Sequence, residues 1–333
     1  MLILAGSYTS MGGPGLVLMG LMGDKLEKIC ENGDVKEPIW AEQGRRTGLV
    51  YIAAAQADGR HACVAAFRVQ EMGMELVSVQ TDDGLENCHL CLNEEETFLY
   101  SANYGDGTIA VFPLSEDGKI LPCVQFVGHT GPCGPNKARQ EGPHAHQVAF
   151  RPGTQELFLC DLGTDSVTVY RAGADGLITP AEEIPCRAGT GPRHLCFDGP
   201  DAFYLAGELG GWLSRFEKGE RGWQCVQMLS SLPENYQGPE NTAAAVRQDA
   251  GHVYVTNRGH NSVAVFPKNR GGRVEKPFFI RTPGAFPRDM ILVPGGFLLA
   301  QQNSGTVSFM ADNGMPGGQL KVPGAVSLLP LRV

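Results

Sequence analysis

The stretch TFLYSANYGDGTIAVF (97–112) decides the fold, because its pattern returns along the chain. It consists of an apolar run, a polar residue, a Gly/Asn/Asp turn and an alternating run that ends in an aromatic residue, which is typical of a β-hairpin. Four further copies follow it: ELFLCDLGTDSVTVY (156–170), AFYLAGELGGWLSRF (202–216), HVYVTNRGHNSVAVF (252–266) and GFLLAQQNSGTVSFM (296–310). A hairpin that recurs in this way indicates a repeat architecture.

The spacing of the copies identifies the repeat. Their last residues are separated by 44 to 58 positions: Phe112, Tyr170, Phe216, Phe266 and Met310. Looser copies occur at 49–67 and 2–20, and seven copies in 333 residues give about 48 residues each, close to the ~40–50 of a four-stranded propeller blade. Helical periodicity is almost absent. We therefore expect an all-β chain whose residues 1–333 form one domain, a seven-bladed β-propeller with four-stranded antiparallel blades.

The two ends of the chain are expected to close the ring. LILAGSYT (2–9) begins inside a blade, and VSLLPLRV (326–333) supplies a further strand. An open ring would leave two unpaired blade edges. The sequence therefore predicts that N- and C-terminal strands share one blade.

Composition limits the partners and the location. A net charge of −9 argues against nucleic acid but leaves room for a small anion held by local arginines. The first 23 residues lack a basic region and are interrupted by MGGPG (11–15), and no stretch is long and apolar enough to span a membrane. Ten irregularly spaced cysteines without an export signal favour reduced thiols and a cytoplasmic location. The oligomeric state is left open.

Polar side chains gather where the innermost strands should begin. These strands are expected at CHLCL (88–92), PHAHQVAF (143–150), PRHLCF (192–197), NTAAAV (241–246) and PRDMIL (287–292). They offer His89, His144, His146, Arg193, His194, Arg288 and Asp289. The hairpin positions after the second strand add Asn103, Tyr104, Asp161, Glu208, Asn257, Arg258 and Gln302. Such residues can tie blades together by hydrogen bonds, but their density favours a small-molecule site at one mouth of the channel.

The pair His144 and His146 poses the sharpest question. Residues i and i+2 of a strand point to one side, so both should face the same way. A metal site would need a third ligand, from Glu208, His194 or Asp161. Cys88 and Cys91 point to opposite sides of a strand and do not suit joint chelation. We therefore expect no metal at this pair.

The stretch GPNKARQEGPHAHQVAFRPGTQELFLCDLGTDSVTVY (134–170) resembles the seven-bladed propeller lactonases of the bacterial 6-phosphogluconolactonase type, which are related to fungal muconate-lactonising enzymes. ANYGDGTIAVFPL (102–114), GTGPRHLCF (189–197) and FPRDM (286–290) resemble other phrases of that family. The resemblance implies opening of a sugar-acid lactone with water, without a metal or an organic cofactor, at a site formed by His144, Arg193, Glu208 and Arg258. An Asn-Glu pair of the family reads Gly207-Glu208 here.

These residues suggest a mechanism for lactone hydrolysis. His144 or Glu208 would activate water, and Arg193 would stabilise the oxyanion. Arg258 and Arg288 would grip a phosphate or carboxylate of a small anionic sugar lactone. His146 would orient His144 or bind substrate, and the remaining predicted substrate contacts are His89, His194, Asn103, Asn257 and Gln302. The alternatives are a muconate-type lactonising cycloisomerase and a non-catalytic propeller that binds a ligand or protein.

Overall fold

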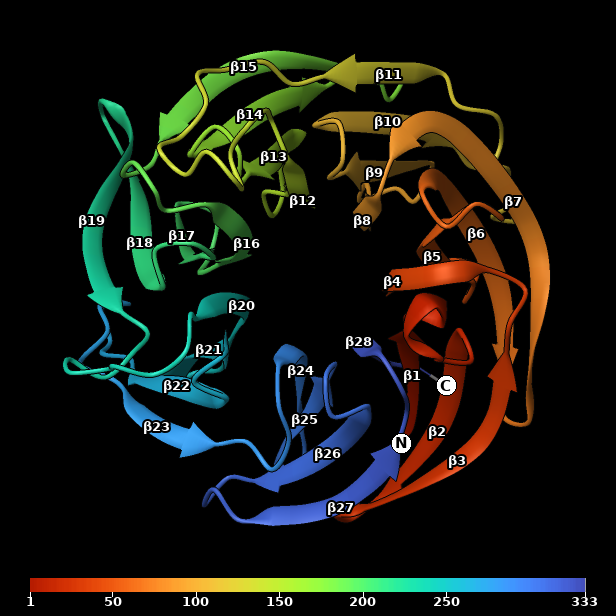
Figure 1. Cartoon of the computed structure of the whole chain (residues 1–333). Coiled ribbons are helices and arrows are strands. Elements are labelled where there is room, and N and C mark those ends of the chain that lie inside the picture. The colour runs from red at the N-terminus through yellow and green to blue at the C-terminus, as the bar shows by residue number, and fades with distance from the viewer. Residues whose placement is uncertain (333) are drawn as a thin grey trace.

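The computed structural model describes residues 1–332, which form a ring of seven four-stranded antiparallel sheets (Figure 1). The innermost strands are β28 (Ala325–Pro330), β4 (Lys36–Gln43), β8 (Asn87–Leu92), β12 (Ala145–Phe150), β16 (Pro192–Phe197), β20 (Thr242–Gln248) and β24 (Pro287–Val293). The second strands are β1 (Leu2–Ser7), β5 (Val50–Ala55), β9 (Phe98–Asn103), β13 (Glu156–Asp161), β17 (Ala202–Gly207), β21 (His252–Arg258) and β25 (Gly296–Gln301). The predicted seven-bladed propeller is confirmed.

The outer half of each blade completes the ring. The third strands are β2 (Leu16–Met22), β6 (His61–Gln70), β10 (Thr108–Pro113), β14 (Ser166–Ala172), β18 (Trp212–Gly219), β22 (Ser262–Pro267) and β26 (Thr306–Ala311). The outermost strands are β3 (Lys25–Asn32), β7 (Gly73–Leu85), β11 (Gln125–Gly128), β15 (Ile178–Pro185), β19 (Gly222–Ser230), β23 (Phe278–Arg281) and β27 (Pro316–Lys321). One short 3₁₀-helix, η1 (Thr9–Met11), follows β1. Within residues 1–332, no helix has the length and apolar character needed to cross a bilayer.

The hydrophobic core lies between the blades. Because alternate residues of a strand point to opposite faces, Ile3 and Ala5 pack against β25 and β26 on one side, whereas Leu4 packs against β5 and β6 on the other. Seven such clusters fill the spaces between neighbouring blades. Both faces of the middle strands are therefore buried, which explains their almost continuous apolar sequences.

The ring is closed by the two ends of the chain, as predicted. β28 pairs antiparallel with β1, with Leu4 opposite Leu329 and Gly6 opposite Ser327. The blade order β28-β1-β2-β3 thus joins the last strand of the chain to its first three. No sheet edge is left open at the junction of the ring.

A β-bulge recurs where the innermost strands begin. The register with the second strand shifts between Asn87 and His89, Ala145 and Gln147, Pro192 and His194, and Pro287 and Asp289. The extra residues in these four blades are Cys88, His146, Arg193 and Arg288. A bulged residue is freed from the ladder and its side chain is re-aimed. The bulges therefore bring four side chains to one level of the channel.

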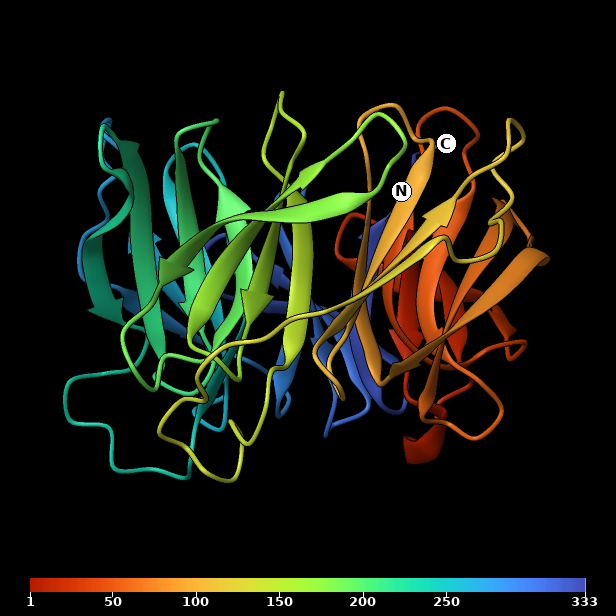
Figure 2. The same ribbon diagram turned by 90° about the horizontal axis from the view of Figure 1, so that it is seen from above.

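Three connecting segments extend from the face on which these bulges lie (Figure 2). They are η1, the segment 129–144 before β12, and the segment 231–241 before β20. Gly107, in the turn of the hairpin 97–112, supports the second of them: its φ is 68°, and a Cβ there would approach Pro143 at 2.6 Å. The turn of the deciding hairpin thus packs directly against the entrance to β12.

Candidate active site

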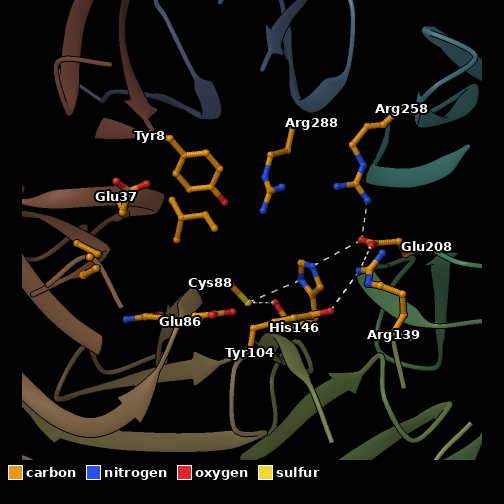
Figure 3. A pocket seen from close by; sticks show the side chains of 15 residues that line it. Tyr8, Glu37, Glu86, Cys88, Tyr104, Arg139, His146, Glu208, Arg258 and Arg288 are labelled. Atoms are coloured by element: carbon orange, nitrogen blue, oxygen red, sulfur yellow. Dashed lines mark hydrogen bonds and ion pairs between the residues drawn. The ribbon is translucent and has the colours of Figure 1, made fainter. Parts of the chain in front are cut away.

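A pocket of about 400 Å³ opens at the mouth of the channel where the bulges lie. Its lining comes from several blades and includes Tyr8, Glu37, Glu86, Cys88, Tyr104, Arg139, His146, Glu208, Arg258 and Arg288 (Figure 3). The predicted residues His146, Glu208, Arg258 and Arg288 are therefore brought together. Arg193 and His194 lie next to them, against a smaller cavity that His146 and Arg288 also border.

Glu208 is the centre of a buried ion cluster. It follows β17 and is only 3% exposed. Its carboxylate forms ion pairs with Arg258 Nη2 at 2.6 Å, Arg139 Nη2 at 2.7 Å and Arg193 Nε at 2.9 Å. Burial alone would raise the pKa of Glu208, but the positive charges of Arg258 and Arg193 hold it well below its usual range. Glu208 is therefore an ionised organiser of arginines at neutral pH.

The arginines differ in how many ion pairs and hydrogen bonds they make with the protein. Burial, together with the like charges of Arg258 and Arg288, lowers the pKa of Arg193 to about 9, which still leaves it charged at pH 7. Arg258 is buried and also donates to Ala243 O at 3.1 Å. Arg288 forms no ion pair with any residue in 1–332, and its polar protein contact is Gln302 Oε1 at 3.3 Å. Arg288 is therefore available to an incoming anion.

The two histidines of the H-x-H pair do not share a position. His144 precedes β12, and its Nδ1 lies 2.8 Å from Tyr104 O, whereas His146 is the bulged residue that lines the pocket. The expectation from strand alternation fails because His144 lies before the strand and His146 is itself the extra residue of the bulge. Within residues 1–332, no three His, Cys, Asp or Glu side chains converge as a metal site would require.

His146 is held as a neutral imidazole beside the ion cluster. Its Nε2 lies 3.8 Å from Glu208 Oε2, and its backbone oxygen accepts a hydrogen bond from Cys88 Sγ at 3.1 Å. Burial and the charge of Arg193 lower the pKa of His146 well below its usual range, although Glu208 opposes this. At pH 7 the ring is therefore neutral, and one of its two nitrogens carries no proton.

Aromatic and imidazole rings form the floor below the pocket. Trp40 of β4 stacks on His89 with ring centroids 4.1 Å apart, and His194 packs edge-on against both. Burial lowers the pKa of His89 and of His194 well below the usual range, so both rings are neutral. His194 also lies 3.3 Å from Arg193 Nη1. These two predicted substrate contacts thus support the site from beneath.

Three other predicted residues lie at the ends of second strands. Asn103 is fully buried and donates to Thr108 Oγ1 and Asp82 Oδ1. Asn257 is fully buried and donates to Ser231 O at 2.6 Å. Neither lines the pocket. Gln302 contacts Arg288 and so touches the site indirectly.

Sequence reasoning did not single out several residues of the pocket. Arg139 comes from the segment 129–144 and bridges Tyr104 Oη (3.2 Å) and Glu208 Oε1 (2.7 Å). The only sequence signal for it was the ARQEGPHAH run. Cys88 could have been found by aligning the innermost strands, which places it in one column with His146, Arg193 and Arg288. Tyr8 and Glu37 come from the N-terminal blade and its neighbour.

Comparison with known proteins identifies the relatives of this arrangement. Residues 2–321 match the family described as "Lactonase, 7-bladed beta-propeller". The chain is 31% identical to the 6-phosphogluconolactonase of Bacillus subtilis, over 98% of this chain and 94% of that protein. A crystal structure of a protein from Lactobacillus plantarum is 27% identical, with a TM-score of 0.89 over 98% of both chains. The periplasmic gluconolactonase of Pseudomonas aeruginosa shares the fold at 24% identity, with a TM-score of 0.90 over 99% of both chains.

Proposed function

The chain belongs to the seven-bladed β-propeller lactonase family, and from this membership and the pocket we propose that it hydrolyses an anionic sugar lactone of the 6-phosphogluconolactone type. The observation that carries the proposal is the cluster of Arg139, Arg193 and Arg258 around one buried carboxylate, with Arg288 facing the same pocket. Glu37 and Glu86 also line the pocket, but around Glu208 the arginines outnumber the carboxylate. Such local positive charge favours a phosphate or carboxylate on the substrate and the oxyanion of ester hydrolysis.

We assign the role of general base to His146. Its imidazole is neutral and lines the pocket, whereas His144 contacts the backbone of Tyr104 and Glu208 is neutralised by arginines. His146 would take a proton from water as the water oxygen bonds to the acyl carbon of the lactone. The π electrons of the lactone carbonyl would then pass to the carbonyl oxygen, which becomes an oxyanion.

The arginines divide between two roles in this proposal. Arg193 and Arg258 are buried and paired with Glu208, so they provide a fixed positive field for the oxyanion. Arg288 has no ion pair within residues 1–332, and the side chain of Arg139 is 39% exposed. These two are therefore the cations that would bind a phosphate or carboxylate substituent.

The assignment of the base is tested by His146→Asn and His144→Asn, assayed on 6-phosphogluconolactone with the spontaneous opening subtracted. General-base help is worth ~10²–10⁴ in rate, so His146→Asn should lower kcat/KM at least ~100-fold. His144→Asn should lower it less than about 5-fold, since His144 does not itself line the pocket and touches it only through Tyr104. The reverse order would assign the base to His144, and wild-type activity in both variants would exclude both histidines as the base.

The substrate class is tested with glucono-1,5-lactone, with and without the 6-phosphate, and with a muconolactone. Arg288→Ala should raise KM for the phosphorylated lactone and leave KM for the unphosphorylated lactone nearly unchanged. Turnover of the muconolactone alone would favour a cycloisomerase. The cytoplasmic location inferred from the cysteines stays a prediction, which cell fractionation would check.

A further inference from the structure

Tyr8 places a hydroxyl group in the pocket without a protein partner. Within residues 1–332 its Oη makes no hydrogen bond, whereas Tyr51 and Tyr100 each donate to a backbone carbonyl at 2.9 Å. The Arg288 guanidinium lies 5.4 Å from the centre of the Tyr8 ring. Figure 3 shows the hydroxyl end of Tyr8 directed toward Arg288 and the middle of the pocket. A partly buried donor in this position is available to a bound ligand.

The position of Tyr8 is fixed by its backbone. Tyr8 N donates to Gly324 O at 2.9 Å, and Tyr8 O accepts from Gly13 N at 2.9 Å and from Met11 N at 3.2 Å. The ring is thus attached both to the segment before β28 and to the turn that contains η1. Little freedom remains for the side chain apart from its own two torsions.

Glu37 anchors the turn that follows Tyr8. Its carboxylate accepts hydrogen bonds from Thr9 Oγ1 at 2.6 Å, Ser10 N at 2.7 Å and Ser10 Oγ at 2.9 Å. Glu37 itself has a φ of 47°, in the left-handed region that non-glycine residues rarely adopt. Such strained residues cluster at functional sites. The hydrogen bonds from Thr9 and Ser10 to Glu37 therefore hold the turn that follows Tyr8, and with it Tyr8, in position beside the pocket.

We propose that Tyr8 is a catalytic residue that donates its phenolic proton to the ring oxygen of the lactone as the acyl–oxygen bond breaks, and that Glu37 is its positioning residue. The inference rests on the proposed hydrolysis. When the tetrahedral intermediate collapses, the carbonyl re-forms and the electron pair of the breaking bond passes to the ring oxygen. That oxygen would leave as an alkoxide, a poor leaving group, unless a proton reaches it.

The charges around Tyr8 suit this step. Burial raises the pKa of Tyr8 and Arg288 opposes the rise, so at neutral pH the phenol keeps its proton, and the phenolate formed on transfer lies beside a cation. The proton that His146 took from water then returns the phenolate to phenol, directly or through solvent. The products are the hydroxy acid carboxylate and one proton, as hydrolysis of a lactone requires.

Tyr8→Phe tests the role, because it removes one oxygen and keeps the ring under Arg288. On the lactone that the wild type opens fastest, kcat should fall ~10²-fold with KM within about threefold. Tyr236→Phe is the matched control, because among residues 1–332 its hydroxyl bonds only to Pro239 O, within the segment 231–241 and away from the pocket. Its kcat should equal that of the wild type. Near-wild-type kcat in Tyr8→Phe, or a loss confined to KM, would overturn the proposal. A wild type that opens no lactone would instead refute the proposed function.

A double-mutant cycle tests Glu37. If Glu37 acts through Tyr8, Glu37→Gln should lower kcat by itself, and Glu37→Gln with Tyr8→Phe should be no slower than Tyr8→Phe alone. Additive losses would show that Glu37 acts elsewhere. Melting temperatures of the three variants separate a local displacement of η1 from loss of the fold.

Discussion

Glu208 shows how one residue can control a site without reacting in it. Breaking a buried pair by removing one partner leaves uncompensated charge in a medium of low dielectric. Here a single carboxylate neutralises Arg193 of its own blade, Arg258 of the next blade and Arg139 of the segment 129–144. Without it, Arg139, Arg193 and Arg258 would repel one another, so the geometry of the anion site depends on a residue that no substrate atom has to touch.

This role predicts a pH dependence of stability. Because the pKa of Glu208 is depressed in the folded state, its contribution to stability is complete above its ordinary value and is lost as the pH falls through the folded-state value. Glu208→Gln should therefore lower the free energy of unfolding by about 3–5 kcal/mol at pH 7, and the difference from the wild type should shrink below about pH 4.

Urea unfolding at several pH values measures this difference. Glu27→Gln, at an exposed position of β3, is the control and should change stability by less than about 0.5 kcal/mol at every pH. A difference that does not change between pH 3 and pH 7 would show that Glu208 does not titrate with a depressed pKa.

At the residue scale, the sequence predicted which residue types gather at the channel mouth but not how they are arranged there. His146, Glu208, Arg258 and Arg288 were placed correctly by counting strands from the repeated hairpin. The order of His144 and His146 depends on a bulge, which is a local change in register that strict alternation cannot reveal. Arg139 and Tyr8 reach the pocket from irregular segments, whose paths no periodicity encodes.

At the element scale, the last residue of each repeated hairpin serves as a packing anchor. Phe266 ends HVYVTNRGHNSVAVF and is 0% exposed, in the cluster between the blade of β20–β23 and that of β16–β19. Its equivalents Phe112, Tyr170 and Met310 are at most 1% exposed. The aromatic residue that identified the repeat in the sequence is therefore the one that fills the space between neighbouring sheets.

Phe266→Ala should destabilise the protein by about 3–5 kcal/mol, because the site is enclosed by two sheets and cannot collapse to fill the cavity. Phe278→Ala removes the same side chain where it is 51% exposed and is the matched control. Thermal unfolding of both variants measures the effect. Equal losses would indicate that Phe266 does not pack as a core residue.

The elements were predictable where the pattern was strong. The strands of each hairpin are buried on both faces, and the turn between them is rich in glycine. The apolar runs and the turn residues therefore predict the same hairpin. The blade of β4–β7 was harder, because its inner strand KEPIWAEQ (36–43) carries a proline and polar residues. In this strand Trp40 forms part of the floor below the pocket, so the strand is built around the site and lacks the apolar run that marks the other blades.

At the scale of the whole molecule, closure through β1 and β28 predicts cooperative unfolding. Deleting residues 1–7 removes β1, which pairs with β28 on one side and with β2 on the other. The melting temperature should fall by about 10 °C or more, because one blade loses a central strand and two clusters lose their β1 residues.

Calorimetry measures both this loss and the number of transitions. One transition in the wild type would support the prediction that residues 1–333 form a single domain. An unchanged melting temperature in the shortened chain would mean that the pairing of β1 with β28 contributes nothing to closure.

At each recurring bulge, the residues that the sheet needs for pairing are different from the residue that faces the pocket region. The neighbours of Cys88, His146, Arg193 and Arg288 must pair with the second strand, but these four residues need not. Each can be exchanged while the ladder beside it keeps its hydrogen bonds. The positions of Cys88, His146 and Arg288 therefore behave as replaceable positions on a constant frame, whereas Arg193 is tied to Glu208 by a buried ion pair. New specificities could arise, in nature or in a library, by substitution at the three positions without that ion pair, with little loss of folding.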